Sequence, residues 1–325
     1  MITRRTLVQA LAGAPFAAGV GLAAAQAFPD KAVKIIVPLP PGSPPDVLAR
    51  VVGEGLAKLW KQAVVVENRP GGTGSVGMQA LARSPADGHT AGILFLTHTV
   101  IAELMAPLPY NTATDLEPVA NAVWLYNVLV VPAGSPIRSL QDLVERARAR
   151  PGALTYASGG NGSPAHLVAE SFCQATQTRM LHVPFRGPAE AVTALIGDQV
   201  SAMFATVSTA TPLIKADKLR ALAVTSPERL AAMATVPTVR ESGLQGLDLK
   251  EWEGFVLPAG TPRPVVARWN QDVFQVLAQP EVRARLGELG MTVAEPNRPE
   301  EFGSLIRREL DHWGGFVRTR GLKPT

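Results

Sequence analysis

Short runs of β-branched residues alternate along this chain with stretches in which apolar residues recur at helical spacing. In Lys34–Trp60, for example, the run Ile35–Val37 is followed by prolines and then by a helical pattern. Such alternation is typical of a mainly parallel sheet covered by helices. The expected strands are 33–37, 64–67, 91–96, 127–131, 154–157, 180–183, 202–205, 219–225 and 254–257. The expected helices are 46–60, 75–83, 140–150, 165–175, 189–196, 262–277, 281–289 and 300–318.

The first 27 residues differ in composition from the rest of the chain. They contain Arg4 and Arg5, no acidic residue, a short apolar stretch and a terminal Ala25-Gln26-Ala27. This pattern predicts a cleavable secretory signal at residues 1–27, and Thr3–Val8 also resembles a twin-arginine signal. A retained amino-terminal anchor is the alternative. We expect a periplasmic location for the mature protein.

Composition argues against several other classes of protein. The 325 residues are 46% hydrophobic and carry a formal charge of +4, which falls to about +2 once the two signal arginines are removed. That charge gives no reason to expect a nucleic-acid partner. The single cysteine, Cys173, rules out an intramolecular disulfide and is expected to be a buried helical thiol. We expect a monomer of one large or two medium domains.

Three strand-to-helix joints place proline at the first helical position. In the first joint, Ser43-Pro44-Pro45-Asp46 matches an S-x-x-D capping box, and the other two are Ser163-Pro164 and Gly187-Pro188. Proline presets the first helical turn and has no N–H group of its own to leave unpaired. Each joint is therefore predicted to hold backbone N–H groups still at a helix amino terminus, where anions bind.

Two glycine-rich stretches, 72–77 and 160–165, match the spacing of a dinucleotide-binding turn. A nucleotide site would place an acid about 20 residues further on, but the chain has 96–98 and 184–186 there, without an acid. We therefore expect no nucleotide and no cofactor, and interpret the glycines as allowing the backbone to approach a small ligand or another loop.

Catalytic and metal-binding patterns are also missing from the sequence. The five histidines show no metal-binding spacing, and no G-x-S-x-G elbow occurs. A hydrolase would need Ser163 or Ser75 close to a histidine and an acid, and His166 is only three residues from Ser163. His98, just past a strand, is a candidate for contact with a ligand. The prediction that remains is a site that binds an anion without catalysing a reaction.

The sequence resembles the Bug (TctC-type) extracytoplasmic solute receptors of tripartite tricarboxylate transporters. The matching segments cover almost all of the mature chain and occur in the family's order; they are VPLPPGSPPDVLAR, VVVENRPGGTGSVGMQALARSPADGHT, LPYNTATDLEPVA, LTYASGGNGSPAHLVAESF, HVPFRGPAEAVTALIGDQVSAMF and KLRALAVTSPERLAAMATVPTVRESG. The resemblance implies a type II periplasmic-binding-protein fold, with two α/β lobes, two crossing strands and a ligand cleft. We expect lobe 1 at 28–126 and 256–325, lobe 2 at 127–255, and crossings near 127–131 and 252–256.

The resemblance also implies a carboxylate held by two opposed loops. Carried onto this chain, the loops and nearby residues are Pro41, Gly42 and Ser43; Gly160, Asn161, Gly162 and Ser163; and Thr73 and Gly74. The expected distal pocket includes Thr97, His98, Phe185, Arg186, Thr206 and Trp252. Two departures from the family pattern are Ser43, where a second glycine is common, and Ala205, where an aspartate is common. An acid at 205 would suit a ligand amino group, so its absence favours a plain aliphatic or aromatic carboxylate.

The expected function is capture of a mono-, di- or tricarboxylate and its delivery to membrane permease subunits of the TctAB type, without catalysis. Two alternatives remain at this point. One is a ligand sensor that feeds a signalling partner, and the other is the secreted hydrolase considered above.

Overall fold

The computed structural model describes residues 28–244 and 250–323. The predicted signal peptide at residues 1–27 lies outside the described residues. None of the described helices is long and apolar enough to cross a membrane.

Ten strands form one continuous sheet. Its main path runs β2-β1-β3-β9-β4-β7-β5-β6, and β8 and β10 also pair with β4. The strands are β1 (Val33–Val37), β2 (Val64–Asn68), β3 (Thr90–Phe95), β4 (Leu116–Pro132), β5 (Thr155–Ser158), β6 (Leu181–Pro184), β7 (Ala202–Thr206), β8 (Leu219–Val224), β9 (Lys250–Pro258) and β10 (Met291–Val293).

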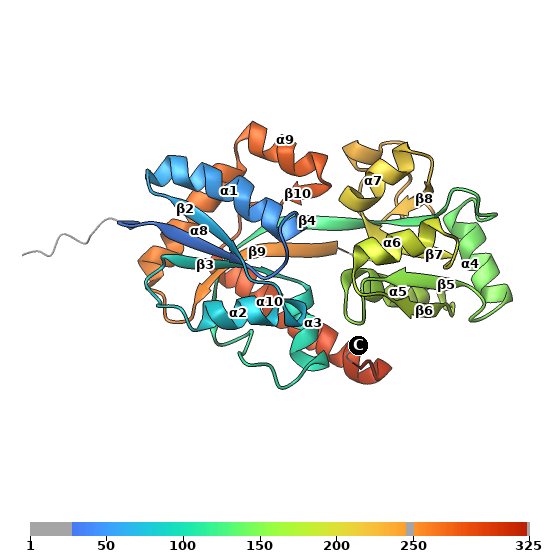
Figure 1. Ribbon diagram of the computed structural model, residues 1–325, viewed down its shortest axis with the longest axis horizontal. Coiled ribbons are helices and arrows are strands. Elements are labelled where there is room, and N and C mark those ends of the chain that lie inside the picture. Colours follow the sequence, from blue (N-terminus) through green and yellow to red (C-terminus); the bar gives the residue numbers. More distant parts are fainter. Residues whose placement is uncertain (1–27, 245–249, 324–325) are drawn as a thin grey trace, which may run out of the picture.

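The long strand β4 joins two halves of the molecule (Figure 1). Its first part, Leu116–Tyr126, pairs with β9, whereas the part from Asn127 to Pro132 pairs with β7 and β8. We call the half with β1, β2, β3, β9 and β10 lobe 1, and the half with β5, β6, β7 and β8 lobe 2. β9 pairs with strands of lobe 1 from Lys250 onward, and the second crossing expected near 252–256 stays a prediction. The lobe boundaries drawn from the sequence stay a prediction.

Helices cover both faces of the sheet in each lobe (Figure 1). Lobe 1 has α1 (Pro44–Trp60), α2 (Ser75–Ala82), α3 (Thr97–Leu104), α8 (Arg263–Leu277), α9 (Pro280–Glu288) and α10 (Pro299–Arg320), with a 3-10 turn at Gly72–Gly74. Lobe 2 has α4 (Leu140–Ala149), α5 (Pro164–Thr176), α6 (Pro188–Ile196) and α7 (Val207–Lys215), with a 3-10 turn at Ala231–Met233.

Each lobe has apolar cores of its own. In lobe 1, the apolar faces of α1 and α8 pack on the sheet through Leu48, Leu56 and Trp269, all fully buried. In lobe 2, Phe172 of α5 and Leu143 of α4 are fully buried in the core of that lobe. Burial of each such side chain contributes roughly 1.5–3 kcal/mol, so each lobe has a hydrophobic core independent of the other.

All expected strands and helices overlap observed ones, but the expectation of a mainly parallel sheet was wrong at its centre. Pairs on either side of the centre, such as β1–β2 and β5–β6, are parallel, whereas every pair described for β4 or β9 is antiparallel. Both strands run through the middle of the sheet, where β4 passes from one lobe to the other and β9 pairs beside it. The sequence analysis also missed α3, α7 and β10: α7 contains Pro212 and several β-branched residues, and β10 is only three residues long.

Candidate functional site

A cavity of about 220 Å³ lies where the two lobes face each other. Lobe 1 contributes loop and helix-start residues to its wall, namely Leu39, Pro44, Pro45, Thr73, Phe95 and Thr97. Lobe 2 contributes Gly159, Ser163, Pro164, Ala165, Pro188, Met203, Phe204 and Thr206. The paired strands β4 and β9 contribute Leu125, Asn127, Glu251 and Glu253.

The three proline-containing joints meet at this cavity. Helices α1, α5 and α6 begin after Ser43, Ser163 and Gly187, as predicted, and each has proline in its first turn. Their first turns line the cavity through Pro44, Pro45, Ser163, Pro164 and Pro188. Because the amino terminus of a helix carries a partial positive charge, three such ends make the wall suitable for an anion.

The first loop is held by Asp46 in a way that differs from the predicted capping box. The Asp46 carboxylate accepts hydrogen bonds from the Gly42 N–H at 2.9 Å and from Arg50 Nε at 3.0 Å, both at Oδ2. Its other oxygen accepts from Asn68 Nδ2 at 2.9 Å. Burial opposes ionisation of this carboxyl, but these bonds outweigh it and lower the pKa of Asp46.

Ser43 does not cap α1 through its side chain. Its hydroxyl donates instead to the Pro40 carbonyl at 2.7 Å, and no side-chain capping bond is formed at this helix start. One of the two N–H groups that a capping side chain can use is absent, because Pro45 occupies the second helical position. Ser43 and Asp46 therefore both stabilise the loop, but not as a reciprocal pair.

The second loop, residues 159–163, is also held by internal bonds. The Gly160 N–H donates to Ser158 Oγ at 3.1 Å, and the Gly162 N–H donates to His166 Nδ1 at 3.1 Å. The Ser163 N–H donates to the Gly160 carbonyl at 3.2 Å. His166 thus orders its loop, as expected from the sequence, and burial, which lowers its pKa to about 4, keeps it neutral as an acceptor.

These bonds change which donors remain for a ligand. The N–H groups of Gly42, Gly160, Gly162 and Ser163 all have acceptors in the loop itself or in the strand or helix that flanks it. The N–H group of Ser43 likewise lies 3.3 Å from the Pro40 carbonyl. By contrast, the Ser163 hydroxyl lines the cavity and has no partner among the described residues. The Ser163 hydroxyl is thus better placed than these loop amides to bind a ligand.

The structure brings only some of the predicted site residues to the cavity wall. Thr73, Thr97, Ser163 and Thr206 line it. Other predicted residues lie elsewhere. Pro41 and Gly42 are exposed on their loop, Gly74 lies beside His98, Asn161 donates to the Lys323 carbonyl at 2.8 Å, and Phe185 packs against the lobe 2 core.

Three residues of the expected distal pocket point away from the cavity. His98 is fully buried between Phe95 and Gly74, and burial lowers its pKa to about 4. The Arg186 side chain is 95% exposed, with Glu190 3.9 Å away. Trp252 is buried edge-on against Phe302 in the lobe 1 core.

Sequence reasoning missed three polar residues of the cavity floor: Asn127, Glu251 and Glu253. Asn127 Nδ2 donates to Glu251 Oε1 at 2.6 Å, whereas Asn127 Oδ1 and Glu253 Oε2 have no partner among the described residues. Burial raises the pKa of Glu251 to about 7, and burial together with the nearby Glu251 raises the pKa of Glu253 well above its usual range. The sequence signal that could have revealed this part of the site is the pair of acids, Glu251 and Glu253, separated by one residue within an apolar strand.

The residues that a hydrolase would need are not arranged for catalysis. Ser163 Oγ has no histidine partner, since His166 Nδ1 accepts from Gly162. Ser158 Oγ lies 2.7 Å from His182 Nε2, but Ser158 is fully buried and its hydroxyl also contacts the Gly160 carbonyl. In the described part of the chain, no cluster of three or more His, Cys, Asp or Glu side chains could hold a metal ion.

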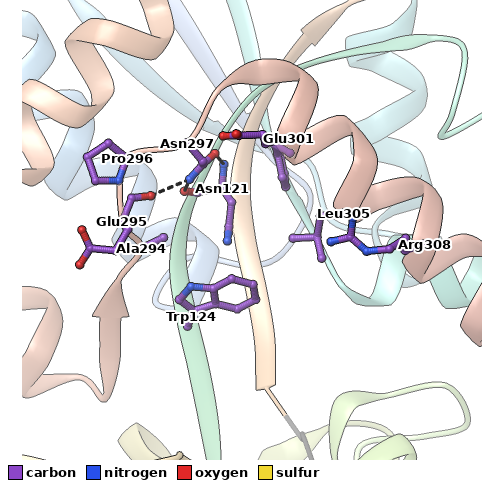
Figure 2. Close-up of a pocket in the computed structure, with 10 residues that line it drawn as sticks. Asn121, Trp124, Ala294, Glu295, Pro296, Asn297, Glu301, Leu305 and Arg308 are labelled. Atoms are coloured by element: carbon purple, nitrogen blue, oxygen red, sulfur yellow. Dashed lines mark hydrogen bonds between the residues drawn. The ribbon is translucent and has the colours of Figure 1, made fainter.

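A second hollow, of about 290 Å³, lies on lobe 1 alone (Figure 2). Figure 2 shows it between Trp124 of β4, the 294–297 segment and Arg308 of α10, with Asn297 bonded to Asn121 and Glu295. Because all of its walls belong to one lobe, movement of the lobes cannot enclose a ligand there. The inter-lobe cavity is therefore the better candidate site.

The fold and the position of the cavity define an α/β periplasmic solute-binding protein. The chain belongs to the family described as Tripartite tricarboxylate transporter family receptor (TctC), which matches residues 48–322. It is therefore a periplasmic solute receptor of the Bug type rather than an enzyme, as the sequence predicted.

Individual relatives agree with this assignment. The chain is 36% identical to a protein of Pseudomonas sp. (strain P51) described as lying in the tcbD-tcbE intergenic region, over 90% of this chain and 87% of the relative. It is 33% identical to BugT of Bordetella pertussis, over 95% of this chain and 96% of the relative.

Two solved structures from Rhodopseudomonas palustris show the same fold. Rpa4515, solved with adipate, is 29% identical with a TM-score of 0.81, over 92% of this chain and all of the other. MatC, solved with bound malate, is 30% identical with a TM-score of 0.76, over 89% of this chain and all of the other.

Proposed function

We propose that this receptor binds a small organic carboxylate in the inter-lobe cavity and delivers it to permease subunits of the TctAB type. The observation that carries the proposal is the meeting of three helix amino termini at one cavity, with the unpartnered Ser163 hydroxyl in its wall. Adipate and malate in the two structural relatives support the ligand class. The permease partner follows from the family.

In this proposal, Ser163, Thr73, Thr97 and Thr206 contact the ligand directly. The other predicted loop residues act by fixing the shape of the two loops, because most of their polar groups already form hydrogen bonds within each joint or, for Asn161, to the segment after α10. These residues are Pro41, Gly42, Ser43, Gly160, Asn161 and Gly162. The ligand would favour the arrangement in which both lobes face it, and so shift the molecule toward a closed state. Residues 1–27 would direct export to the periplasm.

The proposal is tested by a thermal-shift screen of mono-, di- and tricarboxylates, followed by calorimetry on the best ligand. A carboxylate at 100 times its dissociation constant should stabilise the protein by about 2.7 kcal/mol and raise Tm accordingly. If no carboxylate in the set raises Tm or gives binding heat, the proposed function is wrong.

Two serines provide a matched pair for the site. Ser163→Ala should weaken carboxylate binding about tenfold or more, since a hydrogen bond to a charged group is worth about 1.5–3 kcal/mol. Ser84→Ala is the control, because the Ser84 hydroxyl donates to the Ala80 carbonyl at the end of α2 and does not line the cavity. Equal affinities of the two variants would show that Ser163 is not the donor.

A further inference from the structure

The floor of the inter-lobe cavity is acidic. Glu251 and Glu253 are two residues apart on β9, so their side chains leave the same face of the strand, while Trp252 between them enters the lobe 1 core. Glu251 lies opposite Leu125 of β4, and Glu253 lies opposite Phe95 of β3, both of which also line the cavity. The register of β9 with β4 and β3 therefore directs both carboxyl groups toward the cavity.

Two buried polar atoms of this floor have no hydrogen-bond partner among the described residues. Glu253 is 4% exposed and its Oε2 has no partner among the described residues; the same holds for Oδ1 of Asn127, which is 1% exposed. The amide group of Asn127 is oriented by its bond to Glu251, so that an acceptor oxygen is left over. An unpaired buried polar atom costs about 1–3 kcal/mol, which a ligand that pairs with it can recover.

Nothing in the cavity wall neutralises the two acids. No lysine or arginine is among the described residues that line the cavity, and no histidine is. Buried carboxylates normally pair with a cation or remain protonated. The floor therefore offers acceptor oxygens and two carboxyl groups that can ionise. This combination suits a hydrogen-bond donor that carries a positive charge.

We propose that Glu251, Glu253 and Asn127 form a subsite for a cationic nitrogen, so that the ligand of this receptor is a carboxylate that also carries an ammonium or similar group. This inference rests on the proposed carboxylate-binding function and narrows its ligand class. The carboxylate of the ligand lies toward Ser163 and the helix amino termini, and its nitrogen lies toward β9.

A dicarboxylate fits this floor less well than an amino-carboxylate. Its second carboxylate would need both glutamates to stay protonated and would still face the acceptor oxygen of Asn127. The sequence argument against an amino group rested on Ala205, but Ala205 is fully buried in the lobe 2 core and does not line the cavity.

The subsite implies that ligand binding releases protons. Burial raises the pKa of Glu251 to about 7 against the opposing hydrogen bond from Asn127, and burial together with the charge of Glu251 raises the pKa of Glu253 well above its ordinary value. Among the described residues, the neighbouring elements add no other ionisable group to the cavity wall. His98 of α3, buried beside Phe95, is neutral because burial lowers its pKa to about 4. A cationic ligand would ionise the glutamates, so its binding should tighten as pH rises from 5.5 to 8.

The experiment compares probes that differ only in the nitrogen: 4-aminobutyrate against butyrate, 5-aminopentanoate against pentanoate, and the α-amino acids alanine and glutamate against propionate and glutarate. Calorimetry on the purified protein at pH 8 should show at least one aminated probe binding tenfold or more tightly than its partner. Repeating the titration in buffers of different ionisation enthalpy should reveal proton release.

Variants of the two acids separate this subsite from general effects. Glu253→Gln should abolish the preference for the aminated probe while keeping binding of the plain carboxylate. Glu117→Gln is the control, because Glu117 is a half-buried glutamate of β4 that does not line the cavity; it should leave the preference unchanged. The wild-type comparison of paired probes stands even if the Glu253 variant fails to fold.

The outcomes are distinguishable. If plain carboxylates or dicarboxylates bind at least as tightly as every aminated probe, the subsite is refuted while the proposed function stands. Binding that tightens as pH falls would also refute it. If no probe and no carboxylate binds, both the proposed function and this inference fail.

Discussion

At the scale of single residues, the buried glutamates of β9 are the least expected feature of the molecule. A carboxyl group with a raised pKa favours the folded state only while it is protonated. Below the ordinary glutamate pKa of 4.5, the protonated group makes its full contribution to the free energy of unfolding. This contribution is lost as pH rises through the pKa that the group has in the folded protein. Glu251, with a pKa of about 7, should therefore make the ligand-free protein less stable at pH 8 than at pH 5, relative to a variant without this charge.

Glu251→Gln should remove this penalty, since glutamine keeps the acceptor for Asn127 and cannot ionise. Chemical denaturation of the ligand-free protein should show the variant to be more stable than the wild type by about 3 kcal/mol at pH 8, with the difference close to zero at pH 4. A difference that does not change between these pH values would mean that Glu251 does not titrate as described.

At the scale of elements, the loop between β1 and α1 depends on one buried carboxylate. Asp46 connects the loop amide of Gly42, its own helix through Arg50, and β2 through Asn68. The sequence predicted that Asp46 belongs to the helix start, but not that it would hold three elements together. The partners became available only when β2 was placed beside β1.

Asp46→Ala should destabilise the protein by about 2–4 kcal/mol, because it removes the buried carboxylate that accepts hydrogen bonds from Gly42, Arg50 and Asn68. Glu54→Ala on the same helix is a suitable control: Glu54 is exposed and pairs with Lys58 at 3.0 Å on the surface, where such pairs contribute little. Unfolding by urea would measure both changes. Comparable losses in the two variants would contradict the role assigned to Asp46.

At the scale of the whole molecule, contacts between the lobes are made beside the cavity as well as across it. A side chain at Gly162 would meet Leu104 of α3 at 2.7 Å, and Asn161 donates to Lys323 just beyond α10. Figure 1 shows this end of α10 reaching from lobe 1 toward lobe 2. The second loop is thus packed against the other lobe, so its shape influences how closely the lobes approach.

Two glycines with similar backbone strain test this contact. Gly162 has φ +76° and Gly152, in the loop between α4 and β5, has φ +82°, but a side chain at Gly152 would meet nothing within 4 Å. Gly162→Val should hold the lobes apart, enlarge the radius of gyration in small-angle X-ray scattering and weaken ligand binding at least tenfold. Gly152→Val should bear the same kind of strain without either effect. Identical scattering and affinity in the two variants would show that the contact does not control closure.

Local sequence determined the type of most elements and the starts of α1, α5 and α6, because hydrophobic period, glycine and proline act over a few residues. It could not show that the N–H groups of Gly42 and Gly162 would be taken by Asp46 and His166. Nor could it find the acidic floor, because Asn127 and Glu251 are 124 positions apart and meet only when β4 pairs with β9. Which polar atoms stay unpaired at a cavity depends on strand register and lobe packing, and these are properties of the tertiary structure.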